Sequence, residues 1–274
     1  MSLLEQNLQQ IRDARRIVIK VGTSTLTYSN GKLNIRRINT LCQVISDLAN
    51  SGKEMVLVTS GAIGVGMGKL SRSERPADTS MRQALAAIGQ CELMFIYDRL
   101  FGEFNSTVGQ VLITADILDN PVMRRNAANT FEELLALGVI PIVNENDTVS
   151  TVELEGQNIG DNDTLSAYVA ALIHADFLLL LTDIDGLYTA NPATNPDAEL
   201  IPTVTEINGE LRELAGSAGT RFGTGGMATK LNAAVIATNA GIPCCVTRAD
   251  TTEELYRIFD GIQTGTLFLA EKHV

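Results

Sequence analysis

Short, continuously apolar segments alternate with segments of helical periodicity along this 274-residue chain. The clearest apolar runs are residues 17–21, 55–59, 139–143 and 177–181. Strands of this kind are buried on both faces, which is typical of parallel sheets covered by crossover helices on both sides. The pattern predicts an α/β fold, a three-layer α/β/α sandwich with a mainly parallel central sheet. Helices are expected at about residues 3–11, 35–48, 82–104, 126–137, 164–174, 227–240 and 252–259, and further strands at about 108–113, 242–247 and 266–269.

Polar or glycine-rich segments follow four of these strands directly. They are Gly22 to Ser24, Ser60 to Gly64, Asn144 to Asp147 and Thr182 to Gly186. In open parallel sheets, ligands bind beyond the carboxyl ends of the strands. We therefore expect these four segments to line one edge of the sheet and to contain the binding site.

Two glycine-rich turns, far apart in the sequence, are each joined to a lysine. Lys20 precedes Gly22 at the end of an apolar strand, and Lys230 closes the segment that begins at Gly223. Glycine-rich turns expose backbone N–H groups to anions, and lysine adds a full positive charge. The Gly223 segment matches neither the Walker A pattern nor G-x-G-x-x-G. Two such turns suggest that the protein holds a polyphosphate for phosphoryl transfer. Alternatively, the Gly223 segment is only a flexible loop, and the two lysines only extend into solvent.

A second set of side chains is suited to an amino acid ligand. The turn at Ser60, Gly61 and Ala62 either binds a carboxylate or phosphate through its N–H groups or needs glycine for its shape alone. Asn144 to Asp147 and Gly160 to Asp163 offer carboxylate and amide oxygens that could accept hydrogen bonds from an ammonium group. Asn162 or Asp163 could instead only cap the following helix, and Asp163 could hold the two lysines in position.

Charge and composition exclude several classes of function. The net charge is −11, which argues against nucleic acid as a partner because nucleic-acid binding depends on clustered Lys and Arg. An acidic chain that binds a polyphosphate would be helped by a divalent cation. The longest apolar run is too short to span a bilayer, so no membrane association is expected. The four cysteines and two histidines show no metal-ligand spacing, so we expect no metal held by the protein itself. The cysteine pattern is typical of reduced thiols, so we expect a cytoplasmic location.

The predicted helix at about residues 82–104 is unusually apolar for a surface helix. A helix with this composition is buried either in the core or in a subunit interface. We assign no chemistry to it.

Taken together, the motifs resemble the amino acid kinase family. No single motif is decisive, but the set occurs in the expected order from residue 18 to residue 230. The segments that carry the resemblance are Val18 to Ser24, Val58 to Ile63, Val143 to Asp147, Gly160 to Asp163, Leu180 to Asp183 with Gly186 to Tyr188, and Gly223 to Met227 with Thr229 and Lys230. The Asn144 and Gly223 segments most resemble members that phosphorylate L-glutamate.

The resemblance implies ATP-dependent phosphorylation of the L-glutamate side-chain carboxylate to glutamyl 5-phosphate, the first step of proline biosynthesis, with Mg²⁺ on the phosphates. It implies that Lys20 and Lys230 neutralise the transferring phosphoryl group while Asp163 orients them. Glutamate would be bound by Ser60, Gly61, Ala62, Asp147 and Asn162. The nucleotide would be bound by Lys20, Gly22, Thr182, Asp183, Thr224, Gly225, Gly226, Met227, Ala228, Thr229 and Lys230.

The resemblance also implies one kinase domain over residues 1–274, with a glutamate-binding half at roughly 15–175 and a nucleotide-binding half at roughly 176–270. Many members carry an additional C-terminal module called PUA, for which we expect no room after the last strand. Feedback inhibition by proline and a homo-oligomer, a dimer or tetramer, are further expectations. The alternatives are a related kinase of acetylglutamate, aspartate, carbamate or a nucleoside monophosphate, and a non-catalytic sensor of nucleotide or amino acid.

Overall fold

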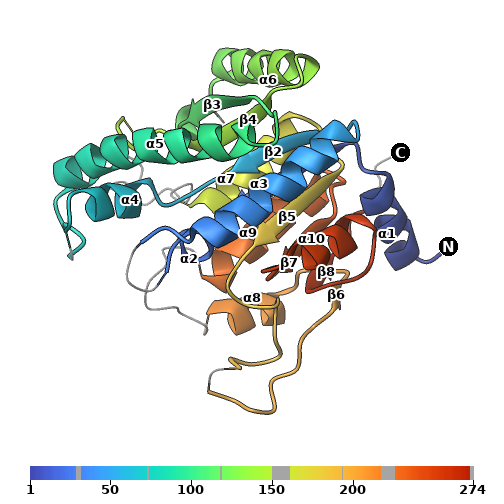
Figure 1. Cartoon of the computed structure of the whole chain (residues 1–274). Helices are drawn as coiled ribbons and strands as arrows, with labels where there is room; N and C mark the ends of the chain where they lie inside the picture. The colour runs from blue at the N-terminus through green and yellow to red at the C-terminus, as the bar shows by residue number, and fades with distance from the viewer. Residues whose placement is uncertain are drawn as a thin grey trace. The chain divides into compact units, whose positions relative to one another are not determined.

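A computed structural model describes residues 1–28, 32–72, 74–117, 119–149, 161–192, 194–216 and 226–271. The chain divides into two compact units. Unit 1 combines residues 1–20 with 163–274, and unit 2 comprises residues 21–162. Figure 1 shows the order of the helices and strands along the chain. None of the described helices is both long and apolar enough to cross a bilayer.

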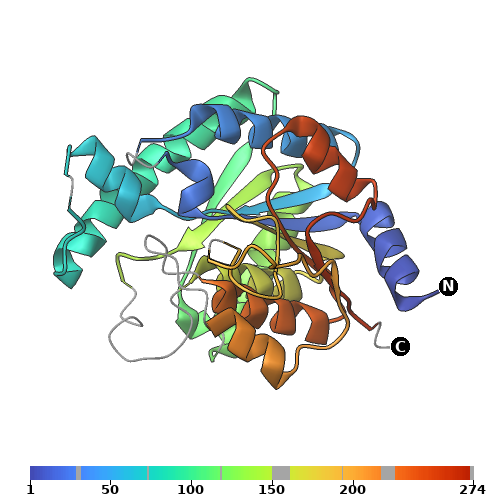
Figure 2. The ribbon, with the colours of Figure 1, turned by 90° about the horizontal axis from the view of Figure 1, so that it is seen from below.

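Unit 2 contains a parallel three-stranded arrangement in the order β3-β4-β2. Its strands are β2 (Glu54–Val58), β3 (Val108–Ile113) and β4 (Ile140–Glu145), and its helices are α2 (Thr23–Leu26), α3 (Ile35–Asn50), α4 (Ala62–Lys69), α5 (Thr79–Gly102) and α6 (Pro121–Ala136). Right-handed crossovers that run in opposite directions along a sheet place their helices on opposite faces. Accordingly, α3 and α5 cover one face of these strands and α6 covers the other (Figure 2).

Unit 1 contains the strand order β1-β5-β7-β8-β6. The strands are β1 (Arg16–Val21), β5 (Phe177–Leu181), β6 (Thr203–Val204), β7 (Cys244–Thr247) and β8 (Thr266–Phe268), and the helices are α1 (Leu3–Asp13), α7 (Asn162–Leu172), α8 (Gly209–Gly216), α9 (Met227–Asn239) and α10 (Thr252–Phe259). The β5–β7 and β6–β8 pairs are parallel, whereas β7 and β8 are antiparallel. In Figure 2, α7 and α9 lie on one side of these strands and α10 on the other.

The predicted fold class is confirmed in both units, because mainly parallel strands lie between helical layers. The strands of the core are almost fully buried, as their continuous apolar sequences predicted. Val18, Leu57, Val143 and Leu179, for example, each have 0% exposure. Hydrophobic burial on both faces is therefore what holds the strand ends, and the polar residues that follow them, in fixed positions.

Some boundaries differ from the sequence-based prediction. Helix α6 begins at Pro121 rather than near residue 126, because Asn120 caps its first turn and proline is well suited to the first helical position. The short helices α2 and α4 were not predicted, since glycine dominates their sequences or flanks. Helix α5 buries only one face, and its Phe95 side chain is 62% exposed. All four cysteines are free thiols.

Candidate active site

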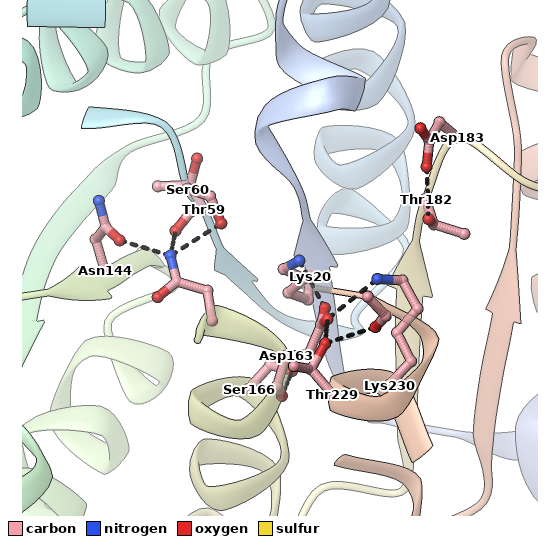
Figure 3. A network of polar contacts seen from close by, with 12 residues as sticks. Lys20, Thr59, Ser60, Asn144, Asp163, Ser166, Thr182, Asp183, Thr229 and Lys230 are labelled. Atoms are coloured by element: carbon pink, nitrogen blue, oxygen red, sulfur yellow. Dashed lines mark hydrogen bonds and ion pairs between the residues drawn. The ribbon is translucent and has the colours of Figure 1, made fainter. Parts of the chain in front are cut away.

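Two lysines distant in the sequence contact one carboxylate in unit 1. Lys20 Nζ lies 2.6 Å from Asp163 Oδ1, and Lys230 Nζ lies 3.1 Å from Asp163 Oδ2. The Thr229 hydroxyl donates a hydrogen bond of 2.8 Å to the same Oδ2. Figure 3 shows the side chains of Lys20 and Lys230 converging on Asp163. The structure thus brings together the three residues for which we predicted catalytic roles.

These three side chains have little contact with solvent. Lys20 and Lys230 are each 6% exposed, and Asp163 is 1% exposed. Burial by itself would raise the pKa of Asp163, but the two lysines and the Thr229 hydroxyl lower that pKa to about 2. Asp163 is therefore ionised at neutral pH. Two buried ammonium groups that share one carboxylate form an arrangement that a polyphosphate anion would complement.

The predicted nucleotide-binding residues of unit 1 lie after β5 and at the start of α9. Thr182 is buried, and its hydroxyl donates a 3.1 Å hydrogen bond to Asp183 Oδ1. Gly226 caps α9, whose first residues include the predicted Met227 and Ala228. Thr224 and Gly225 lie outside the described residues, as do Gly160 and Gly223.

A second polar cluster lies in unit 2, where the Asn162 amide joins two strand ends. Asn162 Nδ2 lies 2.6 Å from the Thr59 carbonyl oxygen, 2.9 Å from Ser60 Oγ and 2.9 Å from Asn144 Oδ1, and it donates hydrogen bonds to them. Figure 3 shows Thr59, Ser60 and Asn144 in this network. Because β2 and β4 are parallel, their carboxyl ends meet at one edge, which places Ser60 beside Asn144. The predicted residues Ser60 and Asn162 are therefore in direct contact.

The glycine at position 61 is explained by backbone shape. Gly61 caps α4 with φ +93°, a left-handed conformation that disfavours other residues. This supports the shape reading of the Ser60–Gly61–Ala62 turn and leaves its proposed carboxylate-binding role open.

The described helices differ in how their N-termini are capped. A side-chain oxygen accepts a hydrogen bond from the first turn of six described helices. The capping residues are Ser2, Asn34, Asp78, Asn120, Asn208 and Thr251. In contrast, α2, α4 and α9 begin at Gly22, Gly61 and Gly226, which supply no side-chain cap. First-turn N–H groups without a side-chain cap suit anionic groups such as carboxylate and phosphate.

Asp147 is half-buried in unit 2, and two arginines act on it. Burial raises the pKa of the Asp147 carboxyl, and Arg82 and Arg75 oppose this change. Arg75 and Arg82 were not among the site residues predicted from the sequence. Arg75 precedes α5 and Arg82 lies in its first turn, so the sequence does show two positive charges close together. Their spacing from Asp147 in the sequence gave no reason to expect them near that residue. Cationic groups in this position could also attract a substrate carboxylate.

In the described parts of the chain, no three His, Cys, Asp or Glu side chains cluster in a way that could hold a metal ion. Mg²⁺ retains several waters and commonly binds through substrate phosphates rather than in an all-protein cage.

Comparison with known proteins agrees with this fold. The chain belongs to the amino acid kinase family, which matches residues 15–248. It is 52% identical over 263 residues to a protein named glutamate 5-kinase from Clostridium perfringens, covering 96% of this chain and 98% of that protein. A glutamate 5-kinase from Listeria innocua is 51% identical, with 96% of each chain covered. A glutamate 5-kinase from Moorella thermoacetica is 49% identical and is covered over 69% of its length.

Solved structures with low sequence identity share the fold. A UMP kinase from Bacillus anthracis superposes with a TM-score of 0.62 at 18% identity, covering 95% of this chain and 98% of that chain. A UMP kinase from Ureaplasma parvum gives a TM-score of 0.63 at 15% identity, covering 93% of this chain and 98% of that chain. At these identities the likeness supports the fold alone.

Proposed function

We propose that this protein is a glutamate 5-kinase, which transfers the γ-phosphoryl group of ATP to the side-chain carboxylate of L-glutamate. The observation that carries the proposal is the buried Lys20–Asp163–Lys230 group. Relatives named glutamate 5-kinase at 49–52% identity over 96% of the chain support the choice of substrate. The products are ADP and glutamyl 5-phosphate, an intermediate suited to proline biosynthesis.

In this proposal the residues of unit 1 act on the phosphates. When bound, ATP supplies the phosphoryl group, and Mg²⁺ on its phosphates screens their negative charge. Lys20 and Lys230 stabilise the negative charge on the oxygens of the transferring group while its bond to the β-phosphate breaks. Asp163 holds both ammonium groups in place. Thr182, Asp183 and residues 224–230 hold the nucleotide, and the N–H groups at the start of α9 contribute to phosphate binding.

The residues of unit 2 recognise glutamate. Asn162 and Asp147 accept hydrogen bonds from the α-ammonium group, and the Ser60 hydroxyl and the N–H groups after Gly61 bind a carboxylate. With these groups of glutamate bound, its side-chain carboxylate remains as the acceptor of the phosphoryl group. One oxygen of that carboxylate forms the new bond to phosphorus. We assign glutamate binding to roughly residues 15–175 and nucleotide binding to roughly residues 176–270.

The activity can be tested directly with the purified protein. Incubation with Mg²⁺, ATP and L-glutamate is expected to form an acyl phosphate, which hydroxylamine traps as a coloured hydroxamate. N-acetyl-L-glutamate, L-aspartate, carbamate and UMP serve as competing acceptors, and chelation of Mg²⁺ is expected to abolish the reaction. No hydroxamate with glutamate, together with ADP formation from another acceptor, would overturn the assignment.

Three finer properties belong to the same proposal. The protein would act in the cytoplasm, proline would inhibit it, and it would assemble as a homo-oligomer. Adding proline to the hydroxamate assay tests the inhibition.

A further inference from the structure

A buried glutamine lies one hydrogen bond behind the proposed glutamate-binding cluster of unit 2. Gln90, on α5, is 9% exposed, and Asn144, at the end of β4, is 2% exposed. Asn144 Nδ2 donates a 2.8 Å hydrogen bond to Gln90 Oε1. The two residues are far apart in the sequence, and no motif pointed to Gln90.

This hydrogen bond and the one from the Glu145 backbone N–H together hold the Asn144 amide in one orientation. A side-chain amide has a donor end and an acceptor end, and reversing it exchanges the two. Because the NH₂ group of Asn144 is bound to Gln90, its oxygen faces the other way. There Oδ1 accepts hydrogen bonds of 2.9 Å from Asn162 Nδ2 and of 2.9 Å from the Glu145 backbone N–H. A reversed Asn144 amide would set its donor group against these two donors.

The orientation then passes to Asn162 and Ser60. Asn162 must present its NH₂ group to Asn144, and the same group donates to Ser60 Oγ. The oxygen at the other end of the Asn162 amide is consequently left to accept a hydrogen bond, for example from an ammonium group. Since Ser60 Oγ accepts a hydrogen bond here, its own hydrogen can be donated to a carboxylate.

We infer that Gln90 is a positioning residue for glutamate recognition: acting through Asn144, it reinforces the arrangement of donor and acceptor ends on Asn162 and Ser60 that the Thr59 carbonyl and the Glu145 N–H also favour. This inference rests on the proposed function, and it adds a residue that does not touch the substrate.

The cost of Gln90 to the fold supports a role beyond packing. Among the described residues, its Nε2 atom is buried and has no hydrogen-bond partner. An unsatisfied buried donor lowers stability, so an apolar side chain of similar length would serve the core at least as well. The polar side chain at this position is therefore explained by its bond to Asn144 rather than by packing.

The test compares Gln90→Met, which removes the acceptor, with Gln90→Glu, which keeps an oxygen for Asn144. Gln43→Met, at an exposed position of α3, is the matched control. Gln90→Met is expected to raise the KM for glutamate about tenfold, since one buried amide loses its partner, while leaving the KM for ATP unchanged. Its melting temperature is expected to stay close to that of the unsubstituted protein, because the loss of the acceptor for Asn144 is offset by removal of the unpaired Gln90 Nε2 donor. Gln90→Glu should recover most of the glutamate affinity, and Gln43→Met should change nothing.

A double-mutant cycle separates action through Asn144 from a general packing effect. In an Asn144→Ala background, Gln90→Met is expected to change the KM for glutamate by less than about twofold, because the residue it acts through is gone. An equal effect of Gln90→Met in both backgrounds would overturn the inference. So would a Gln90→Met protein whose KM for glutamate stays within twofold of the unsubstituted value, or whose KM for ATP rises equally.

The failure of the inference and the failure of the proposed function are distinguishable. If the unsubstituted protein forms no glutamyl phosphate, the proposed function fails and the inference fails with it. If the unsubstituted protein is active but Gln90→Met behaves like Gln43→Met, only the positioning role of Gln90 fails. Glutamate binding measured by calorimetry without nucleotide provides a second readout and should weaken in parallel with the rise in KM.

Discussion

Replacing Asp163 with asparagine is the perturbation whose outcome the structure defines best. The asparagine keeps the shape of the side chain but removes the negative charge that contacts both Lys20 and Lys230. The ordinary pKa of 3.8 falls to about 2 in the folded protein, and the difference corresponds to about 2 kcal/mol of stability at neutral pH. Leaving two buried ammonium groups without their carboxylate raises the expected loss to about 3 kcal/mol.

The dependence on pH has a definite sign. A carboxyl whose pKa is lowered by folding stabilises the protein fully above its unfolded pKa, and this contribution disappears as the pH falls through the folded pKa. For Asp163 that window runs from about 4 down to about 2. The difference in unfolding free energy between the unsubstituted protein and Asp163→Asn should shrink by about 1 kcal/mol between pH 7 and pH 3.

Urea denaturation at both pH values provides the measurement. Asp250→Asn is the matched control, because Asp250 pairs with Arg248 at 2.6 Å on the surface, where the two side chains are 31% and 46% exposed. Solvent-exposed pairs contribute about 0–1 kcal/mol, so the control should change stability little. If Asp163→Asn destabilised the protein no more than Asp250→Asn, or by an amount independent of pH, the reasoning about the buried carboxylate would be refuted.

Two further substitutions test the site and its support. Lys230→Ala should lower kcat at least about 100-fold, equivalent to about 3 kcal/mol of transition-state stabilisation, with little change in glutamate affinity. Lys69→Ala, at an exposed position, is the control. A Lys230→Ala protein with normal kcat and weaker glutamate affinity would contradict the proposed role. Gly89→Ala would place a Cβ atom 1.7 Å from the Ala62 carbonyl oxygen and should destabilise the protein by about 1–3 kcal/mol. Gly102→Ala has nothing within 4 Å of its Cβ and should be nearly neutral in thermal melting, so equal melting temperatures for the two variants would argue against close packing of α4 on α5.

The sequence determined much about this protein without any tertiary information. Continuous apolar strands such as residues 177–181 fixed the parallel α/β class, because only a sheet covered on both faces buries such a run. Lys20 at the end of a buried strand indicated an anion, since an unpaired charge there is costly. Both conclusions depend on residues that are close together in the sequence, namely the residues of an apolar run and the residues that follow it directly.

Only the tertiary structure decided which partners the polar side chains choose. The sequence left open whether Asp163 caps a helix or holds the lysines, and the fold places it 2.6 Å from Lys20 and 3.1 Å from Lys230. Gln90 contacts Asn144 although the two residues are 54 positions apart in the sequence, and no local pattern predicts this contact. The physical reason is that hydrogen bonds and ion pairs depend on position within tenths of an ångström, which is set by how distant helices and strands pack together.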